Sequence, residues 1–443
     1  MNGITQRFAR SFVAACLIAA LALVAAAPVA AQQTVQLRYM IWDSNQYPAY
    51  QKAIEIFMQE NPHIKVNIEL IPWSNYWTKL NTEAAGGTAP DVFWVYNSPL
   101  PQMAEANMLL DQTPLIQRDG VDLSKYNPVL VDNLSYQGKI YAIPKDQDSL
   151  GLFYNVEALK AAGYENFPED LTWSRDPDSE FIRFLQSLTI DAQGRRAYEE
   201  GFNPQRIRQY GFVFNPIALN LMTYLMASNG AEILDKETGK ALLDTPEARE
   251  VMQLVHDLIF KYHVMPNYNA IDAANNGQNL FYAGRAAIYL DGSWMVLPVQ
   301  QNAAGFTPGI APVMKGPKGA VNRTNDLGDA IYARTAHPEE AWELVKFLAG
   351  PTTQKILAET GTVIPADLAF ADLWVEYYKQ HGIDASVFVE QLQGRLVGDP
   401  VSTKINEFTE IYRRYVSLLF NGAISVDEAI EGIVTETNAM MEP

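Results

Sequence analysis

Two hydrophobic patterns alternate along the chain, and this alternation limits the possible fold more than any other feature. Residues 35–41 and 65–70 place apolar side chains at every second position, as strands do. Apolar residues at helical spacing fill 50–58, and a second helical stretch spans 73–85. A short apolar strand follows at 91–96. Strands that alternate with helices predict an α/β lobe with a largely parallel sheet.

A comparable pattern recurs later in the chain. Strands are predicted at 151–154 and 286–290, and a helix at 338–348. Another helix is predicted to begin at Pro246, with Thr245 as its N-cap. No flexible linker separates these blocks, and a length of 443 residues suits two or three domains of roughly 150 residues each. We therefore expect two α/β lobes that pack closely.

The amino terminus has the order of charges and apolar residues that is typical of a secretory signal peptide. Arg7 and Arg10 precede an apolar run at 11–27, and small residues follow at 28–31. This order predicts that residues 1–31 form a signal peptide that is cleaved on export. The mature protein would then lie outside the cytoplasm, in the periplasm or at the cell surface.

The only cysteine, Cys16, lies inside this amino-terminal segment. The residues before it resemble a lipid-attachment box, so a lipid anchor at Cys16 stays open as the alternative to cleavage after residue 31. If the segment is cleaved, the mature chain has no thiol for a disulfide, a metal ligand or a nucleophile.

Charge and motifs exclude several functions. The net charge of −18 repels phosphate backbones, which argues against a nucleic-acid partner. The chain has no nucleophile elbow and no phosphate-binding loop. The histidines do not show metal-ligand spacing; they are His63, His256, His263, His337 and His381. We therefore expect no catalytic residues, no metal and no cofactor.

Aromatic and short polar side chains coincide where predicted strands end. Trp42 follows the first strand, and Trp294 follows the strand at 286–290. Ligands of open α/β sheets bind beyond the carboxyl ends of the strands. Aromatic rings can cover the apolar face of a sugar while carboxylates accept hydrogen bonds from its hydroxyls. Each tryptophan alone would also suit an ordinary core position, but their repeated coincidence with Asp and Asn favours a saccharide site.

Several segments, in this order and spacing, resemble a known family. They include LRYMIWDSN, GGTAPDVFWV, FYAGRAAIYLDGSWM and DLGDAIYARTAHPEEAWELVKFLAG. The chain is similar, from Gln32 to about Ala366, to family 1 of the extracellular solute-binding proteins of ABC sugar importers. The resemblance implies a non-enzymatic binding protein, expected to be a monomer, that delivers a small-molecule ligand to a membrane permease.

The resemblance also implies a type II periplasmic-binding-protein fold, in which crossing strands join two α/β lobes around a ligand cleft. By similarity, the first lobe would comprise 32–145 plus 306–350. The second would comprise 146–305 plus 351–443.

The strand-end pattern and the resemblance together predict the ligand-binding residues. These are Trp42, Asp43, Asn45, Tyr76, Trp94, Asn97, Asp146, Asp148, Asn220, Trp294, Gly328, Asp329 and Arg395. The chain departs from the family pattern at Asp326 and Asp329, where relatives often have glycines, so the identity of the sugar stays open. Two alternatives also remain: the same fold binding a polyamine or other small organic solute, and a secreted carbohydrate-active enzyme that uses two carboxylates.

Overall fold

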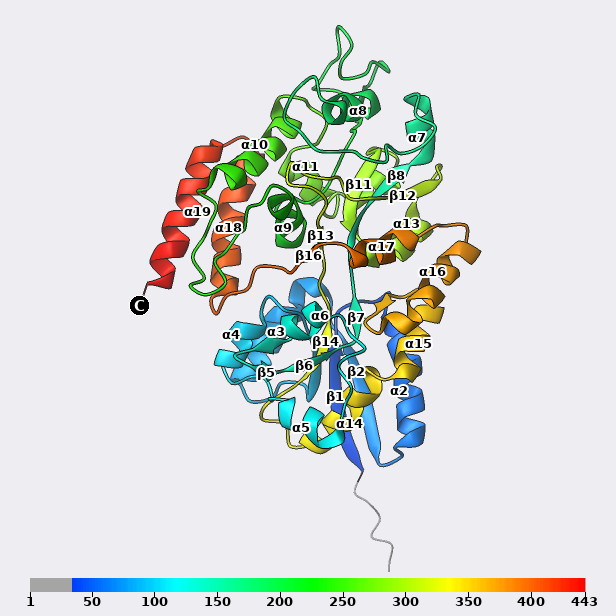
Figure 1. Ribbon diagram of the computed structural model, residues 1–443, viewed down its shortest axis with the longest axis vertical. Helices are drawn as coiled ribbons and strands as arrows, with labels where there is room; N and C mark the ends of the chain where they lie inside the picture. The colour runs from blue at the N-terminus through cyan, green and yellow to red at the C-terminus, as the bar shows by residue number, and fades with distance from the viewer. Residues whose placement is uncertain (1–33, 443) are drawn as a thin grey trace, which may run out of the picture.

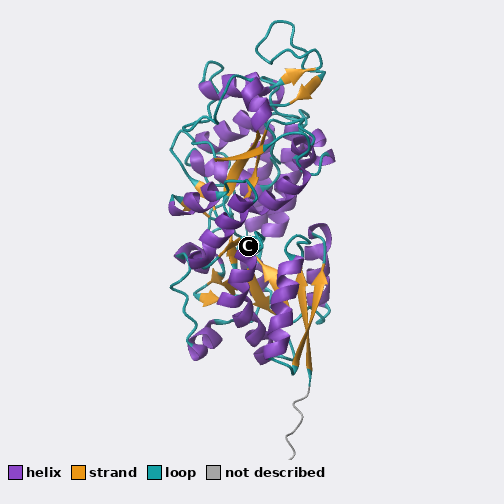
Figure 2. Ribbon diagram, turned by 90° about the vertical axis from the view of Figure 1, so that its right-hand side faces the viewer, coloured by secondary structure: helices purple, strands orange, loops and turns teal. Residues whose placement is uncertain are grey.

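The computed structural model describes residues 34–442, which form two lobes stacked end to end (Figures 1 and 2). The core of the first lobe comes from 37–143 and 330–366. The core of the second lobe comes mainly from 150–321 and 371–433. This arrangement confirms the predicted two-lobed α/β fold. The predicted signal peptide and Cys16 lie outside the described residues.

The first lobe is built on a five-stranded sheet with the order β2-β1-β3-β14-β6. β1 pairs in parallel with β2 and β3, whereas β14 runs antiparallel to both of its neighbours. The sheet is therefore parallel where the alternating pattern predicted it, and strands from later in the chain complete it. The strands are β1 (Val35–Ile41), β2 (Ile64–Leu70), β3 (Val92–Val95), β6 (Ala142–Pro144) and β14 (Gly328–Ile331).

Helices cover both faces of this sheet (Figure 1). The connection from β1 to β2 and that from β2 to β3 run in opposite directions, so right-handed crossovers put α2 and α3 on opposite faces. α14 and α15 pack beside α2. The helices of this lobe are α2 (Tyr47–Glu60), α3 (Trp73–Ala85), α4 (Leu100–Glu105), α5 (Thr113–Asp119), α6 (Pro128–Asn133), α14 (Pro338–Leu348) and α15 (Pro351–Glu359). A small hairpin joins β4 (Ser135–Tyr136) to β5 (Lys139–Ile140).

The second lobe has a three-stranded antiparallel sheet with the order β11-β8-β12. Its strands are β8 (Leu150–Asn155), β11 (Ile288–Gly292) and β12 (Pro308–Pro312). Its helices are α7 (Val156–Ala161), α8 (Glu180–Leu188), α9 (Leu219–Ser228), α10 (Pro246–Phe260), α11 (Tyr268–Ala273), α12 (Gln278–Tyr282), α13 (Val296–Asn302), α16 (Ala371–Gln380), α17 (Ser386–Glu390), α18 (Ile405–Phe420) and α19 (Val426–Met441). A short ribbon pairs β9 (Ile190–Asp191) with β10 (Ile207–Gln209).

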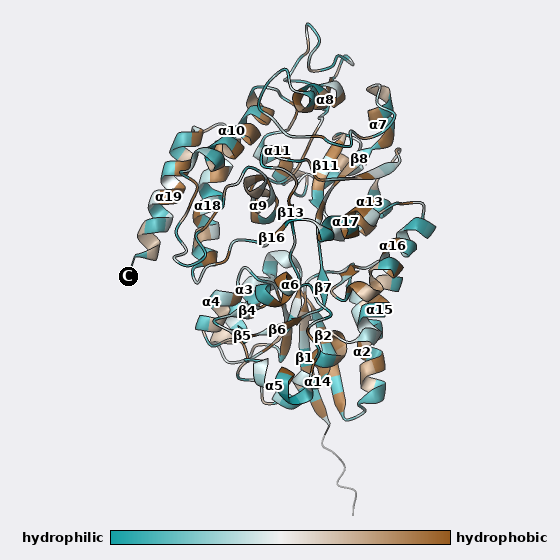
Figure 3. Cartoon of the chain, viewed as in Figure 1, coloured by the Kyte–Doolittle hydropathy of each residue, from teal (hydrophilic) through white to brown (hydrophobic). Residues whose placement is uncertain are grey.

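Local sequence explains why these helices form where they do. α10 begins at the predicted residue because the Thr245 side chain accepts a hydrogen bond from the Ala248 backbone N–H. α18 and α19 carry apolar residues on one side only, and Figure 3 shows both helices with mixed hydrophobic and hydrophilic surfaces. Their apolar sides pack on each other and on α10, which closes the core.

The chain passes between the lobes three times. The first passage runs through β7 (Asp146–Gln147), the second through β13 (Asn322–Arg323) and the third through β15 (Ile364–Pro365). β7 pairs with β15, and β13 pairs in parallel with β16 (Leu396–Val397) from the carboxyl-terminal part of the chain. These short pairs form the connection between the lobes.

Two segments lie in a different lobe from the one that the family resemblance implied. Residues 306–321 lie with the second lobe, because β12 completes the second sheet by pairing with β8. Residues 351–366 lie mainly with the first lobe, because α15 buries Ile356 and Leu357 in the first core. The second and third passages therefore occur later in the chain than the expected boundaries at 306 and 351.

Candidate functional site

Aromatic side chains gather at the carboxyl-terminal edge of the first sheet. Trp42 follows β1, Tyr96 follows β3, and Trp73 and Trp77 lie in the first two turns of α3. The centroid of the Trp42 ring lies 5.1 Å from that of Trp73 and 5.9 Å from that of Trp77. Tyr96 packs against both Trp73 and Trp77. We call these four residues the aromatic platform; Trp73 is 51% exposed, and the other three are partly exposed.

Trp94 and Tyr76, both predicted to bind ligand, lie beneath the aromatic platform. Both are fully buried, and their rings pack edge-on against Trp42. The Tyr76 hydroxyl donates to the Trp94 carbonyl at 2.9 Å, and Trp94 Nε1 donates to the Tyr39 hydroxyl at 2.6 Å. These contacts make the two residues a support for Trp42, with no exposed ring surface of their own.

A buried polar network continues below Trp94. The Tyr39 hydroxyl donates to Asp329 Oδ1 at 2.8 Å. Burial raises the pKa of Asp329 to about 6, although the nearby charge of Lys145 opposes this shift. The Lys145 ammonium is also buried, and lies 3.9 Å from the centroid of the Trp94 ring and 3.0 Å from Asp146 Oδ2. Asp329 and Asp146 therefore hold this network together rather than pointing into open space.

Gly328, the other residue predicted in the loop before β14, lies inside the first sheet. It is paired with Val95 on one side and Pro144 on the other. A methyl group in its place would approach Ala142 Cβ to 2.6 Å, so the residue is required for close packing of the sheet.

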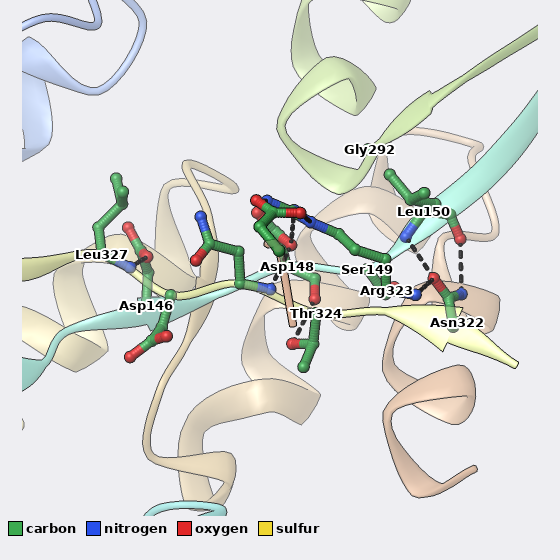
Figure 4. A network of polar contacts seen from close by, with 12 residues as sticks. Asp146, Asp148, Ser149, Leu150, Gly292, Asn322, Arg323, Thr324 and Leu327 are labelled. Carbon is green, nitrogen blue, oxygen red and sulfur yellow. Dashed lines mark hydrogen bonds and ion pairs between the residues drawn. The ribbon is translucent and has the colours of Figure 1, made fainter. Parts of the chain in front are cut away.

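The passages between the lobes carry the charged part of the site (Figure 4). Asp148, which follows β7, accepts a hydrogen bond from Arg323 Nη1 at 2.6 Å and another from the Asn325 backbone N–H at 3.0 Å. Asp146 accepts a hydrogen bond from the Leu327 backbone N–H at 2.9 Å. Burial raises the pKa of Asp148 to about 7, and the positive charge of Arg323 opposes this shift.

Trp294 faces the same charged group from the second lobe. Its ring lies 5.9 Å from the Arg323 guanidinium carbon, a cation–π distance. The orientation of the ring requires Gly292, because a methyl group there would overlap the indole. The neighbouring Asp291 accepts hydrogen bonds from the Tyr289 hydroxyl and the Gly292 backbone N–H, and burial raises its pKa to about 6.

The segment after β16 brings the two lobes into contact. The Asp399 carboxylate forms an ion pair with Arg323, and the Asp399 carbonyl accepts a hydrogen bond from Asn97 Nδ2 at 3.4 Å. Ser98 Oγ donates to the Pro400 carbonyl at 2.7 Å. The charges of Asp399 and Arg323 both act on the pKa of Tyr96, whose net shift is upward mainly because its hydroxyl group is desolvated. The aromatic platform and the charged group therefore meet at the junction between the lobes.

The remaining predicted residues take no part in the contacts described above. Asp43 accepts a hydrogen bond from the Asn45 backbone N–H at 2.8 Å, and the two form the turn between Trp42 and α2. Asn220 is in the first turn of α9, which packs against β13 and β16. Arg395 is exposed and lines a separate cavity of about 170 Å³ in the second lobe.

Sequence reasoning missed two residues at the centre of this arrangement. Arg323 occurs in a polar stretch with no aromatic neighbour, and Asp399 lies beyond the region of family resemblance. Trp73 and Trp77 carried a signal, because both occur at the start of a predicted helix after the second strand. Their spacing of four residues puts them on one side of that helix.

The site combines aromatic surfaces with hydrogen-bond acceptors, which is the chemistry of saccharide binding. Among residues 34–442, no three His, Cys, Asp or Glu side chains are grouped closely enough to hold a metal ion. Over the same residues, no helix has both the length and the apolar character needed to cross a membrane.

The model of the family of bacterial extracellular solute-binding proteins matches residues 42–355. The chain belongs to this family. A putative binding protein of Brucella abortus is 23% identical to it over 434 residues, which are 96% of this chain and 98% of that protein. The maltotriose-binding protein of Pyrococcus abyssi is 24% identical over 330 residues, 72% of this chain and 64% of that one.

Solved structures agree with the fold of this solute-binding protein. An ABC substrate-binding protein from Listeria monocytogenes, in complex with cycloalternan, superposes with a TM-score of 0.81 at 22% identity. The match covers 92% of this chain and 99% of that chain. These relatives are binding proteins, and the family is extracellular. The solute-binding protein therefore works outside the cytoplasm.

Proposed function

We propose that this solute-binding protein captures a mono- or oligosaccharide between its lobes and delivers it, as a monomer, to the membrane permease of an ABC importer. One observation carries the proposal: Tyr96 of the aromatic platform lies close enough to Asp399 and Arg323 to feel their charges, and Trp294 of the second lobe packs against the same Arg323. Rings of the sugar would stack on the aromatic faces, and its hydroxyls would donate to Asp148. The names of the maltotriose-binding relative and of the cycloalternan complex support this choice.

The alternatives fit the site less well. A polyamine could make cation–π contacts with the aromatic rings. However, Asp148 and Asp399 are already paired with Arg323, and Asp146 with Lys145, which leaves less unpaired negative charge for its several ammonium groups. A glycosidase needs one carboxyl group free to protonate the leaving oxygen and a second to act as base or nucleophile. Here Asp148 and Asp399 are both engaged by Arg323, which suits binding better than proton transfer.

A ligand screen tests the proposal. The melting temperature of the protein would be measured with maltose, maltotriose, lactose, cycloalternan or spermidine. A saccharide at 100 times its dissociation constant should stabilise the fold by about 2.7 kcal/mol. Mass spectrometry of the mixture should recover the sugar unchanged. Stabilisation by spermidine alone would favour the polyamine alternative, and a cleaved sugar would favour the enzyme.

A further inference from the structure

Arg323 joins three parts of the chain that are far apart in the sequence. Its side chain is 4% exposed. Nη1 donates to Asp148 Oδ1 at 2.6 Å, and Nε donates to Asp399 Oδ1 at 2.8 Å, with a second bond from Nη2 to the same carboxylate. The planar guanidinium suits this task, because its donors point in fixed directions toward two carboxylates at once.

The two oxygens of Asp148 have different surroundings. Oδ1 accepts both the Arg323 bond and the Asn325 backbone bond. Oδ2 accepts no hydrogen bond from any of the described residues, and the Asp148 side chain remains 21% exposed. The protein therefore fixes one oxygen and leaves the other available for a hydrogen bond to the ligand.

We propose that Arg323 is a positioning residue for ligand binding, which favours the ionised form of Asp148 and aims its free Oδ2 at the hydroxyl groups of the ligand. Arg323 itself is too buried to be a principal ligand contact, so it acts through Asp148. This inference rests on the proposed function, because it specifies how the same site selects a ligand that donates hydrogen bonds.

The charges around Asp148 explain why it needs Arg323. Asp399 and Asp146 both act on Asp148, and each raises its pKa, as does burial. Asp326 is a further buried acid close enough to feel the charge of Asp148. Arg323 is the cation that contacts Asp148, and without it this carboxylate would lie among like charges. Asp148 would then hold a proton at neutral pH and lose its value as an anionic acceptor.

The first experiment needs no ligand. ¹³C NMR of protein labelled at the aspartate carboxyl carbons would follow the titration of Asp148, with Asp148→Asn used to assign its signal. We expect Arg323→Gln to raise the pKa of Asp148 and Asp399→Asn to lower it. These opposite shifts follow from removing a neighbouring positive and a neighbouring negative charge. The control is Arg413→Lys on the exposed face of α18, where the side chain is 54% exposed, and it should shift nothing.

The second experiment measures binding of maltotriose by calorimetry. At pH 7, Arg323→Gln should weaken binding about ten-fold, since a charge-assisted hydrogen bond is lost. Asp148→Asn should weaken it as well. The double variant should bind no more weakly than Asp148→Asn alone, because Arg323 acts through Asp148. At pH 9 the affinity of Arg323→Gln should recover, whereas that of Asp148→Asn should not.

The outcomes separate the two proposals. Losses that multiply in the double variant, or an Asp148 signal that does not move, would overturn the positioning role. If the wild type binds no saccharide, the proposed function fails, and the NMR titration still decides whether Arg323 controls Asp148. Should Arg323→Gln not fold, Arg323→Lys keeps the charge but loses the planar fork, and it replaces Arg323→Gln in the binding comparison. The Asp399→Asn titration then decides the charge argument.

Discussion

Asp148 and Arg323 lie 175 positions apart in the sequence, and their side chains meet at 2.6 Å between the lobes. Each residue belongs to a passage that connects the lobes, so the charged part of the candidate site is also part of the hinge. A ligand that binds Asp148 therefore acts directly on the segments that a movement of the lobes must bend. A ligand that contacts both lobes would shift the population toward the closed arrangement to the extent that it binds that form more tightly.

Replacement of Trp294 tests stacking in the second lobe. We expect Trp294→Ala to weaken maltotriose binding by about 2 kcal/mol, or about thirty-fold, because it removes an aromatic anchor. The melting temperature without ligand should change little, since the ring is partly exposed. Tyr198→Ala is a matched control, because this aromatic residue is 58% exposed in the segment that joins β9 to β10. Unchanged affinity in Trp294→Ala would rule out the stacking role.

Trp73 and Trp94 should respond in opposite ways to the same change. Trp73 is 51% exposed, so Trp73→Ala should weaken maltotriose binding and leave the free energy of unfolding almost unchanged. Trp94 is fully buried, so Trp94→Ala should lower the free energy of unfolding by about 3–5 kcal/mol. Calorimetric titration and urea unfolding measure the two quantities. A Trp94→Ala protein with normal stability would show that this ring is not part of the core.

Buried carboxylates make stability depend on pH in an unusual direction. Burial raises the pKa of Asp148 to about 7 and that of Asp291 and Asp329 to about 6, compared with about 4 in an unfolded chain. The stabilisation from these groups is present below pH 4 and is lost as pH rises through 6 and 7. We therefore expect the free energy of unfolding, measured in urea, to fall between pH 5 and pH 8. Asp291→Asn should flatten this slope, and a stability that instead increases over the same window would contradict the assignment.

The bond between Ser98 and the Pro400 carbonyl tests the contact between the lobes. Ser98→Ala removes a 2.7 Å hydrogen bond, which is worth about 1 kcal/mol. If the bond forms only when the lobes close, maltotriose affinity should fall about five-fold with little loss of stability. Ser417→Ala, on α18 at the surface, serves as the control. A loss of stability without a loss of affinity would mean that the bond also persists in the open form.

Small-angle X-ray scattering measures the closure of the two lobes directly. Saturating maltotriose should reduce the radius of gyration of the protein, because hinged lobes close around a ligand bound between them. A scattering profile that does not change at saturation would contradict ligand-driven closure.

Local signals predicted parts of both lobes. The start of α10 at Pro246 and the platform position of Trp42 both follow from patterns within a few residues. Trp94 shows where such signals stop. It lies within β3 and points into the core, whereas Trp42 comes just after β1, yet both tryptophans precede polar residues in the sequence. The direction of a ring depends on strand register and packing, which the local sequence does not contain.

Arg323 could not have been identified from its own neighbourhood. Its burial follows from the pairing of β13 with β16, more than seventy residues later, and from the passage of β7 alongside. A polar stretch such as VNRTND would ordinarily be expected at the surface. Contacts between segments that are distant in the sequence depend on the topology of the fold. Here the topology brings Arg323 into contact with Asp148 and Asp399.

The position of β14 also sets the order in which the molecule can be completed. β14 lies between β3 and β6 in the first sheet, yet it follows nearly two hundred further residues of chain. During synthesis, the amino-terminal part therefore leaves the ribosome long before this inner strand exists, and it cannot complete its sheet until Ile331 has been made. Most domains fold as units soon after they emerge. This one must remain incomplete for longer, which would leave the chain available for threading through an export channel before it folds.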